Sequence, residues 1–273
     1  MSISLRNSRG LLLLIVSYFF YFNSTILYSA SIPSDDKVLI ETGKPKYKEL
    51  PDSFRLLIWN IHKAESGQNW QKDFQKLTEQ SDIVLLQEGY LNETYKAAIN
   101  YFPNILWSFA ISFIYEGFET GVVTGSLAQP IMTKWLRSQG REPFYESPKM
   151  TILTQYTLPY SDKNLLVANF HGINFVSNDS FYQQMDQVIQ ALEKHQGPTI
   201  FAGDFNTWNG YRMEYLESHC KKMGLKPVEF KQDPRFVRLD HIFYRDLVAY
   251  DPQVLNQIYS SDHFPIKVNF KIQ

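Results

Sequence analysis

Residues 200–209 read I-F-A-G-D-F-N-T-W-N, and this stretch decides the fold. Apolar and small residues run up to Gly203, and Asp204, Phe205 and Asn206 then supply a carboxylate, an aromatic ring and an amide. Asp and Asn are poor strand residues. A chain that leaves a buried strand in this way either turns here, which both residues favour, or needs their polar groups. The rest of the sequence decides between these two explanations.

Other apolar runs of strand length end in the same narrow set of polar residues. The runs 54–60 and 82–88 close on an amide and a carboxylate, and the run 164–170 is followed by an imidazole. A single residue of this kind fits a turn, but many of them at strand ends favour a shared site. The residues in this set are Asn60, Glu88, His171, Asn174, Asp204, Asn206, Asp240, Asp262 and His263.

The residue types in this set fit one kind of chemistry. Carboxylate and amide oxygens are ligands that Mg²⁺ or Mn²⁺ prefers, and histidine transfers protons near neutral pH. Phosphodiester hydrolysis places negative charge on phosphoryl oxygens and on the leaving oxygen, where a divalent cation and hydrogen-bond donors stabilise it. The set therefore predicts metal-assisted hydrolysis of a phosphate ester.

Strands and helices are expected to alternate along the chain from residue 54 to residue 271. Apolar residues at helical spacing separate the strand-like runs, and no interior gap is typical of a domain boundary. This alternation predicts an α/β protein of layered sheets with helices outside. Helices are expected near residues 70–80, 92–101, 180–195 and 209–223.

The motifs, taken in their order along the chain, resemble the endonuclease/exonuclease/phosphatase superfamily. That superfamily includes DNase I, AP endonucleases, neutral sphingomyelinases and inositol polyphosphate 5-phosphatases. The resemblance implies a four-layer α/β sandwich, in which two packed, mostly antiparallel sheets are flanked by helices and the site lies at one edge. The stretches that carry it are Ile58–Ile61, Leu85–Glu88, Gly203–Asn206, Leu239–Tyr244 and Ser261–Pro265.

The resemblance also implies a metal ion and its ligands. Glu88 would be the principal ligand of Mg²⁺ or Mn²⁺, with Asn60 beside it and Asp262 supporting the metal or the base. His62 stands two residues after Asn60, where AP endonucleases carry an acidic ligand, and His171 replaces a tyrosine motif of those enzymes. Both departures point away from abasic-site repair. We expect His62 to be exposed or to lie outside the ligand set.

The catalytic roles follow from the same resemblance. Asp204 and Asn206 would orient or deprotonate the attacking water, and Asn206 would also hold the phosphate. Asp240 would pair with His263, which acts as a general base or a phosphate stabiliser. His171 would donate to a phosphoryl oxygen or to the leaving group.

Three further expectations concern residues beside this machinery. Asn174 is expected to contact substrate. Arg137, Arg141 and Lys149 form a group of loop charges that we expect to be solvated, with a substrate-contacting loop as the alternative. Substrate specificity is expected to reside in loops at 103–118 and 129–148, which carry no motif.

Composition limits the choice of partners. The chain carries 27 basic and 28 acidic residues among 273, with no long basic run. Proteins that grip long nucleic acids usually carry a basic footprint, so tight non-specific binding of polynucleotides is not expected. Nucleic acid, a phospholipid head group and a phosphorylated small molecule all stay open as substrates. An aromatic content of 15% favours a lipid or membrane-proximal substrate slightly.

The N-terminus carries a targeting signal. Two arginines precede an apolar run at 11–22, which is the pattern of a secretory signal peptide. Residues 1–30 are therefore expected to be a signal peptide of an exported, periplasmic or secreted protein. Alternatively, residues 11–30 anchor the protein in the membrane. A polar linker is expected at 31–53, followed by the catalytic domain at 54–273.

Three functions stay open at this point. The first is a metal-dependent phosphodiesterase, nuclease or phosphatase, and the second is a sphingomyelinase-like phospholipase C that acts on lipid head groups. The third is an inactive module that binds phosphoesters without turnover. No protein partner can be inferred. Because the central residues of the family motif are all intact, the inactive module ranks below the two enzymes.

Overall fold

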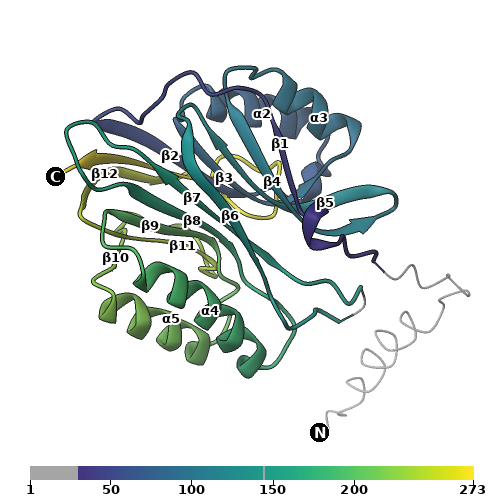
Figure 1. The fold of residues 1–273 in the computed structure, drawn as a ribbon. Helices are drawn as coiled ribbons and strands as arrows, with labels where there is room; N and C mark the ends of the chain where they lie inside the picture. The colour runs from purple at the N-terminus through teal and green to yellow at the C-terminus, as the bar shows by residue number, and fades with distance from the viewer. Residues whose placement is uncertain (1–29, 144) are drawn as a thin grey trace, which may run out of the picture.

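Two β-sheets pack against each other in the computed structural model, which describes residues 30–143 and 145–273 (Figure 1). The first sheet has seven strands in the spatial order β1-β4-β5-β3-β2-β13-β12. These are β1 (Leu39–Thr42), β2 (Ser53–Asn60), β3 (Ile83–Tyr90), β4 (Leu106–Tyr115), β5 (Phe118–Ser126), β12 (Leu247–Val254) and β13 (Ile266–Ile272).

The second sheet has six strands in the order β10-β11-β9-β8-β7-β6. Its strands are β6 (Pro130–Arg137), β7 (Met150–Tyr156), β8 (Leu165–His171), β9 (Thr199–Asp204), β10 (Lys226–Pro227) and β11 (Asp240–Arg245).

Four α-helices in the described chain cover the outer faces of the two sheets (Figure 1). The first pair, α2 (Gln68–Thr78) and α3 (Glu93–Asn100), packs its apolar face on the seven-stranded sheet. The second pair, α4 (Asn178–Glu193) and α5 (Gly210–Lys222), packs on the six-stranded sheet. A third apolar cluster fills the space between the sheets. The predicted four-layer sandwich is confirmed.

Two parallel strand pairs explain why polar groups gather at one edge. Strand β2 runs parallel to β3, and β8 runs parallel to β9, whereas the other pairs are antiparallel. A parallel pair needs a crossover helix, here α2 and α4, and it places both carboxyl ends at the same edge of the sheet. Asn60, Glu88, His171 and Asp204 lie at or near these four carboxyl ends.

The segment at 31–53 is part of the domain, so the expectation of a linker was wrong. Strand β1 pairs with β4 over Leu39–Thr42, and Val38 and Leu50 are buried against the rest of the protein. The polar sequence reflects an edge strand with exposed side chains. The predicted signal or anchor falls almost entirely on residues 1–29, outside the described chain.

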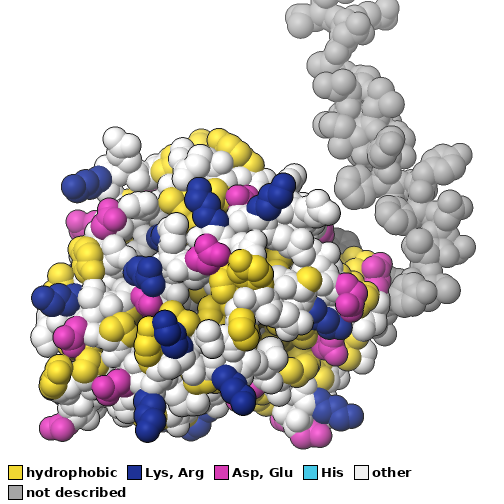
Figure 2. Space-filling model, turned by 90° about the horizontal axis from the view of Figure 1, so that it is seen from above, with side chains coloured by type: hydrophobic (Ala, Val, Ile, Leu, Met, Phe, Trp, Pro, Cys, Tyr) yellow, Lys and Arg dark blue, Asp and Glu magenta, His cyan; other side chains and the backbone are white. Residues whose placement is uncertain are grey.

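The two segments expected to be specificity loops both contain a strand. The segment 103–118 contains β4, and 129–148 begins with β6 at the edge of the second sheet. Among the residues described, no helix is both long and apolar enough to cross a membrane. Figure 2 shows basic and acidic side chains interspersed on the face seen from above, as the balanced charge predicts.

Candidate active site

Asn60 and Glu88 reach the site from the neighbouring strands β2 and β3. The side-chain amide of Asn60 donates to Asp204 Oδ2 at 3.0 Å and to Glu88 Oε1 at 3.5 Å. Glu88 has a backbone φ of 57°, and the register of β3 shifts between Leu86 and Gly89. A left-handed glutamate inside a bulge is strained, and such strain is typical of functional sites. The bulge turns the carboxylate of Glu88 toward Asn60.

The opening motif places Asp204 and Asn206 at the end of β9. Gly203 has a φ of +140°, and a Cβ atom there would lie 2.0 Å from the carbonyl oxygen of Phe170. Only glycine therefore lets β9 approach β8 this closely. One carboxylate oxygen of Asp204 accepts the backbone N–H of Asn206 at 3.0 Å. The side-chain amide of Asn206 donates to Gly172 O at 2.9 Å.

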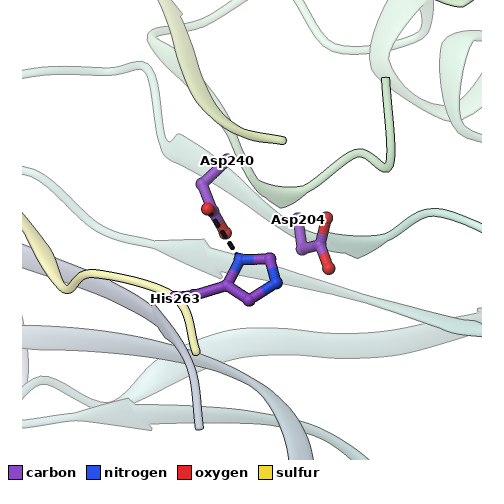
Figure 3. Close-up of side chains that lie close together, drawn as sticks. All are labelled: Asp204, Asp240 and His263. Atoms are coloured by element: carbon purple, nitrogen blue, oxygen red, sulfur yellow. Dashed lines mark hydrogen bonds and ion pairs between the residues drawn. The ribbon is translucent and has the colours of Figure 1, made fainter. Parts of the chain in front are cut away.

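The Asp240–His263 pair lies on the side of Asp204 that is opposite Asn60 and Glu88. Asp240 lies directly across from Asp204 in the β9–β11 ladder. Asp240 Oδ2 accepts a hydrogen bond from His263 Nδ1 at 2.8 Å, and Figure 3 shows the imidazole ring between the two carboxylates. Burial alone would lower the pKa of His263, but Asp240, together with Asp204 and Asp262, outweighs burial and raises the pKa to about 10. His263 is therefore an imidazolium at neutral pH.

His171 closes the other side of the site, at the end of β8. Its Nε2 lies 3.7 Å from Asp204 Oδ2 and 3.9 Å from Glu88 Oε1. Burial lowers the pKa of His171 well below its usual value, and the positive charge of Lys149 lowers it further. At neutral pH His171 is therefore a neutral imidazole, whereas His263 is charged.

The two carboxylates at the centre of the site have opposite protonation tendencies. Burial raises the pKa of Asp204, and the neighbouring charge of Asp240 raises it further. Burial would also raise the pKa of Glu88, but Lys149 and other nearby groups outweigh burial and lower it to about 2. Glu88 therefore stays ionised at neutral pH, while Asp204 is suited to accept a proton.

A cavity of about 280 Å³ adjoins Glu88 and His171. Lys149 lines it and forms an ion pair with Glu142 at 3.0 Å, with its side chain only 12% exposed. The expectation that Lys149 is a solvated loop charge was therefore wrong. Lys63 also lines the cavity and lies 3.6 Å from Glu88. Neither lysine belongs to a motif: Lys63 lies three residues after Asn60, whereas Lys149 reaches the site only through the packing of a distant segment.

Seven of the nine predicted site residues come together in this way, and two lie apart. Asp262 is 60% exposed in its side chain and contacts His62 at 3.9 Å. The backbone N–H of Asn174 donates to Glu142 Oε1 at 2.7 Å, and the side-chain oxygen of Asn174 accepts from the N–H of Phe175. The described contacts thus give Asp262 and Asn174 local structural partners.

Arg212 is a supporting residue that the sequence pattern did not reveal. It is fully buried on α5 and lies between the rings of Phe181 and Trp208. Its guanidinium donates to the backbone carbonyls of Ile173, Val176 and Asn206. Arg212 therefore joins the loop after His171 to the loop that carries Asn206.

The donor atoms in this site fit a divalent cation. Glu88 and Asp204 are carboxylates that share one amide donor, Asn60, so two acidic side chains meet at one point of the site. A hard cation with oxygen ligands would relieve that repulsion. Asp204, Asp240 and His263 form a second group, whose ligand atoms lie within 4.8 Å of one another. The site could therefore hold a metal on either side of Asp204.

Sequence comparison places the chain among known proteins. Residues 57–263 match the profile described as the Endonuclease/Exonuclease/phosphatase family. The chain belongs to this family. The endonuclease/exonuclease/phosphatase family thus accounts for the whole set of motifs between β2 and the loop before β13. Its members act on phosphoester bonds, which makes hydrolysis of such bonds the general chemistry of the site.

Similar proteins agree with this assignment. A UPF0294 protein of Vibrio parahaemolyticus is 30% identical over 253 residues, which cover 90% of this chain and 88% of that protein. An endonuclease/exonuclease/phosphatase family protein from Bacteroides thetaiotaomicron has a TM-score of 0.63 at 16% identity, over 82% of this chain and 99% of that chain. ANGEL2, a 2′,3′-cyclic phosphatase, has a TM-score of 0.63 at 12% identity, over 86% and 98%. The two structural likenesses show the shared family fold.

Proposed function

We propose that this protein is a divalent-metal-dependent phosphoester hydrolase. The observation that carries the proposal is the pair of carboxylates, the half-buried Glu88 and the buried Asp204, between a charged imidazolium and a neutral imidazole. Hydrolysis of a phosphate ester needs a base for water and positive groups for the phosphoryl oxygens. The site offers both within a few ångströms.

Glu88 and Asn60 would hold the metal, for which Mg²⁺ or Mn²⁺ is the best match to oxygen donors. The bound ion would supply positive charge to the phosphoryl and leaving oxygens. We place the metal on this side of Asp204 because His263 is protonated and its Nδ1 is already bonded to Asp240. An imidazolium repels a cation and has no free lone pair to offer.

Asp204 would accept the proton of the attacking water. Its raised pKa makes it a stronger base than an exposed aspartate, and general base catalysis of this kind contributes about 10²–10⁴-fold to the rate. His263 would donate from Nε2 to a phosphoryl oxygen, because Asp240 fixes its Nδ1. Asn206 would orient the water or the phosphate. This assigns phosphate stabilisation, rather than proton removal, to His263.

His171 would serve as a neutral hydrogen-bond donor to a phosphoryl oxygen or to the leaving group. Its position between Glu88 and Asp204 supports that role, because a group bound near both carboxylates lies within its reach. We propose that Asp262, expected to support the metal or the base, and Asn174, expected to contact substrate, instead support the loops on which they lie. Asp262 is exposed and Asn174 is half-buried, so we expect both to have a smaller effect on turnover than the buried residues.

Metal-dependent turnover on a panel of phosphoesters tests this proposal. The panel includes plasmid DNA, sphingomyelin vesicles and inositol polyphosphates, each with Mg²⁺, with Mn²⁺ and with a chelator. We expect turnover that the chelator abolishes and that Glu88→Gln and His263→Ala lower by at least about 10²-fold. Glu93→Gln, an exposed acid on α3, is the matched control.

Two results would contradict the proposal. If Glu88→Gln retains the activity of the parent chain, the metal assignment is wrong. If the folded protein binds phosphoesters tightly in every metal but hydrolyses none, the inactive binding module is the better description.

A further inference from the structure

Apolar side chains stand exposed on the loops that carry the candidate site. Five large apolar side chains in the described chain are at least 70% exposed, and four of them lie near the site, three on these loops and Tyr211 in the first turn of α5. The fifth is Tyr160, on the connection between β7 and β8 at the opposite edge. We call the group at the site the apolar rim. Its members are Phe175, Trp208, Tyr211, Phe236, Val237 and Tyr259.

Each part of the rim is tied by a short stretch of chain to a site residue. Phe175 follows His171 by four residues, Phe236 precedes Asp240 by four, and Tyr259 lies before His263 on the same loop. Four residues span at most about 14 Å. Because the site residues converge at one edge, the rim must surround that edge.

The N-terminal segment joins the domain at this same edge. The backbone N–H of Ile114 donates to Ser31 O at 2.7 Å, and the next residue, Tyr115, lines the cavity beside Glu88. The chain ends at the far edge, after β13 (Figure 1). The apolar run 11–22 is separated from Ser31 by eight residues, which reach at most about 30 Å. A bilayer that held this run would lie close to the rim.

Charge argues against a nucleic acid as the partner of the rim. The net charge of the chain is −1. Three cations beside the site have acidic partners: Lys63 with Glu88, Lys149 with Glu142, and Arg238 with Asp233. Polynucleotide binding relies on free cations, whereas aromatic and aliphatic side chains enter the interface of a bilayer without net charge.

We propose that the apolar rim docks on a phospholipid bilayer and turns the site toward lipid-borne phosphoesters. This substrate class rests on the proposed function, because the chemistry is that of the same site. The docking itself depends only on the exposed side chains and on the point where the N-terminal segment meets the domain. Residues of the rim would enter the interface, while the opposite edge would stay in water.

An environment-sensitive fluorophore on a single introduced thiol tests the docking. The full chain is suited to this experiment because its one cysteine, Cys220, is buried. The variants are Phe236→Cys and Tyr259→Cys on the rim, with Tyr160→Cys as the matched control. Phe236 and Tyr160 are 102% and 101% exposed, so the labels start in equivalent surroundings. All three variants keep the same N-terminal segment. Any binding of that segment to the vesicles therefore contributes equally to the three fluorescence responses.

Mixed vesicles of phosphatidylethanolamine and phosphatidylglycerol serve as the probe. We expect a blue shift and stronger emission from labels at positions 236 and 259, and no change at position 160. Equal responses at all three positions, or none, would overturn the proposal. So would a rim label that responds to single-stranded DNA but not to vesicles. A chain that docks but hydrolyses no phosphoester would refute the proposed function and retain the docking surface.

Discussion

Replacing Asp240 with asparagine tests how the charge of His263 is maintained. The imidazole of His263 is largely buried, and burial by itself lowers its pKa. The carboxylate of Asp240, 2.8 Å from Nδ1, raises the pKa to about 10 instead. In Asp240→Asn the neighbouring amide carries no charge. We therefore expect the pKa of His263 to fall well below 10, toward its ordinary value of 6.5, with Asp204 and Asp262 still raising it.

The size of the effect on stability follows from this shift. A tenfold change in proton affinity is worth about 1.36 kcal/mol, so raising a pKa from 6.5 to about 10 corresponds to roughly 5 kcal/mol. Removing one partner of a buried ion pair costs about 3–5 kcal/mol, which agrees with that figure. At pH 6 we expect Asp240→Asn to lower the free energy of unfolding by roughly this amount.

The dependence on pH has a definite sign. Because the folded pKa of His263 is raised, the ion pair contributes fully below pH 6.5 and is lost as the pH rises through about 10. The difference in unfolding free energy between parent and variant should therefore shrink steadily toward pH 10. Near that pH only the neutral hydrogen bond is left, worth about 1 kcal/mol.

Urea unfolding of the metal-free protein at several pH values measures this difference, and NMR titration of His263 reports its pKa directly. Asp36→Asn, at an exposed acid, is the control and should show no such trend. Removing Asp240 also relieves the repulsion on Asp204 and so changes the pKa of that carboxyl group. The pH dependence of the unfolding free energy above pH 8 therefore reports on His263 more cleanly than the dependence at lower pH. A constant difference between pH 8 and pH 10, or a parent His263 that titrates near 6.5, would refute the reasoning.

Two further predictions concern the backbone around the site. In Gly203→Ala the new Cβ would lie 2.0 Å from Phe170 O at a φ of +140°, so we expect a loss of more than about 3 kcal/mol. Gly210→Ala, where nothing lies within 4 Å, should be neutral or stabilising in the same thermal melts. Arg212→Met removes a buried cation bonded to three carbonyls and should cost about 3–5 kcal/mol in urea unfolding. Arg238→Met, at a largely exposed arginine, is its control, and equal losses in the two would contradict the assignment.

Local sequence patterns predicted the layers and most elements of the fold. Runs of apolar residues predicted the central strands, because those strands are covered on both faces. The pattern missed β6, whose side chains are mostly half-buried at the edge of its sheet. It also misread 31–53 as a linker, since β1 exposes most of its side chains. Edge strands are held by backbone hydrogen bonds, which leave little signal in the side chains.

The sequence by itself determined the residue types of the site and their order along the chain. The order of Asn60, Glu88, Asp204 and His263 was enough to indicate the family and its chemistry. Tertiary structure alone decided the charge of each group, because a pKa depends on burial and on neighbours far away in the chain. Lys149, about 60 residues from Glu88, thus helps to keep that carboxylate ionised. The exposed rim around the site also emerges only when the separate loops meet at one edge.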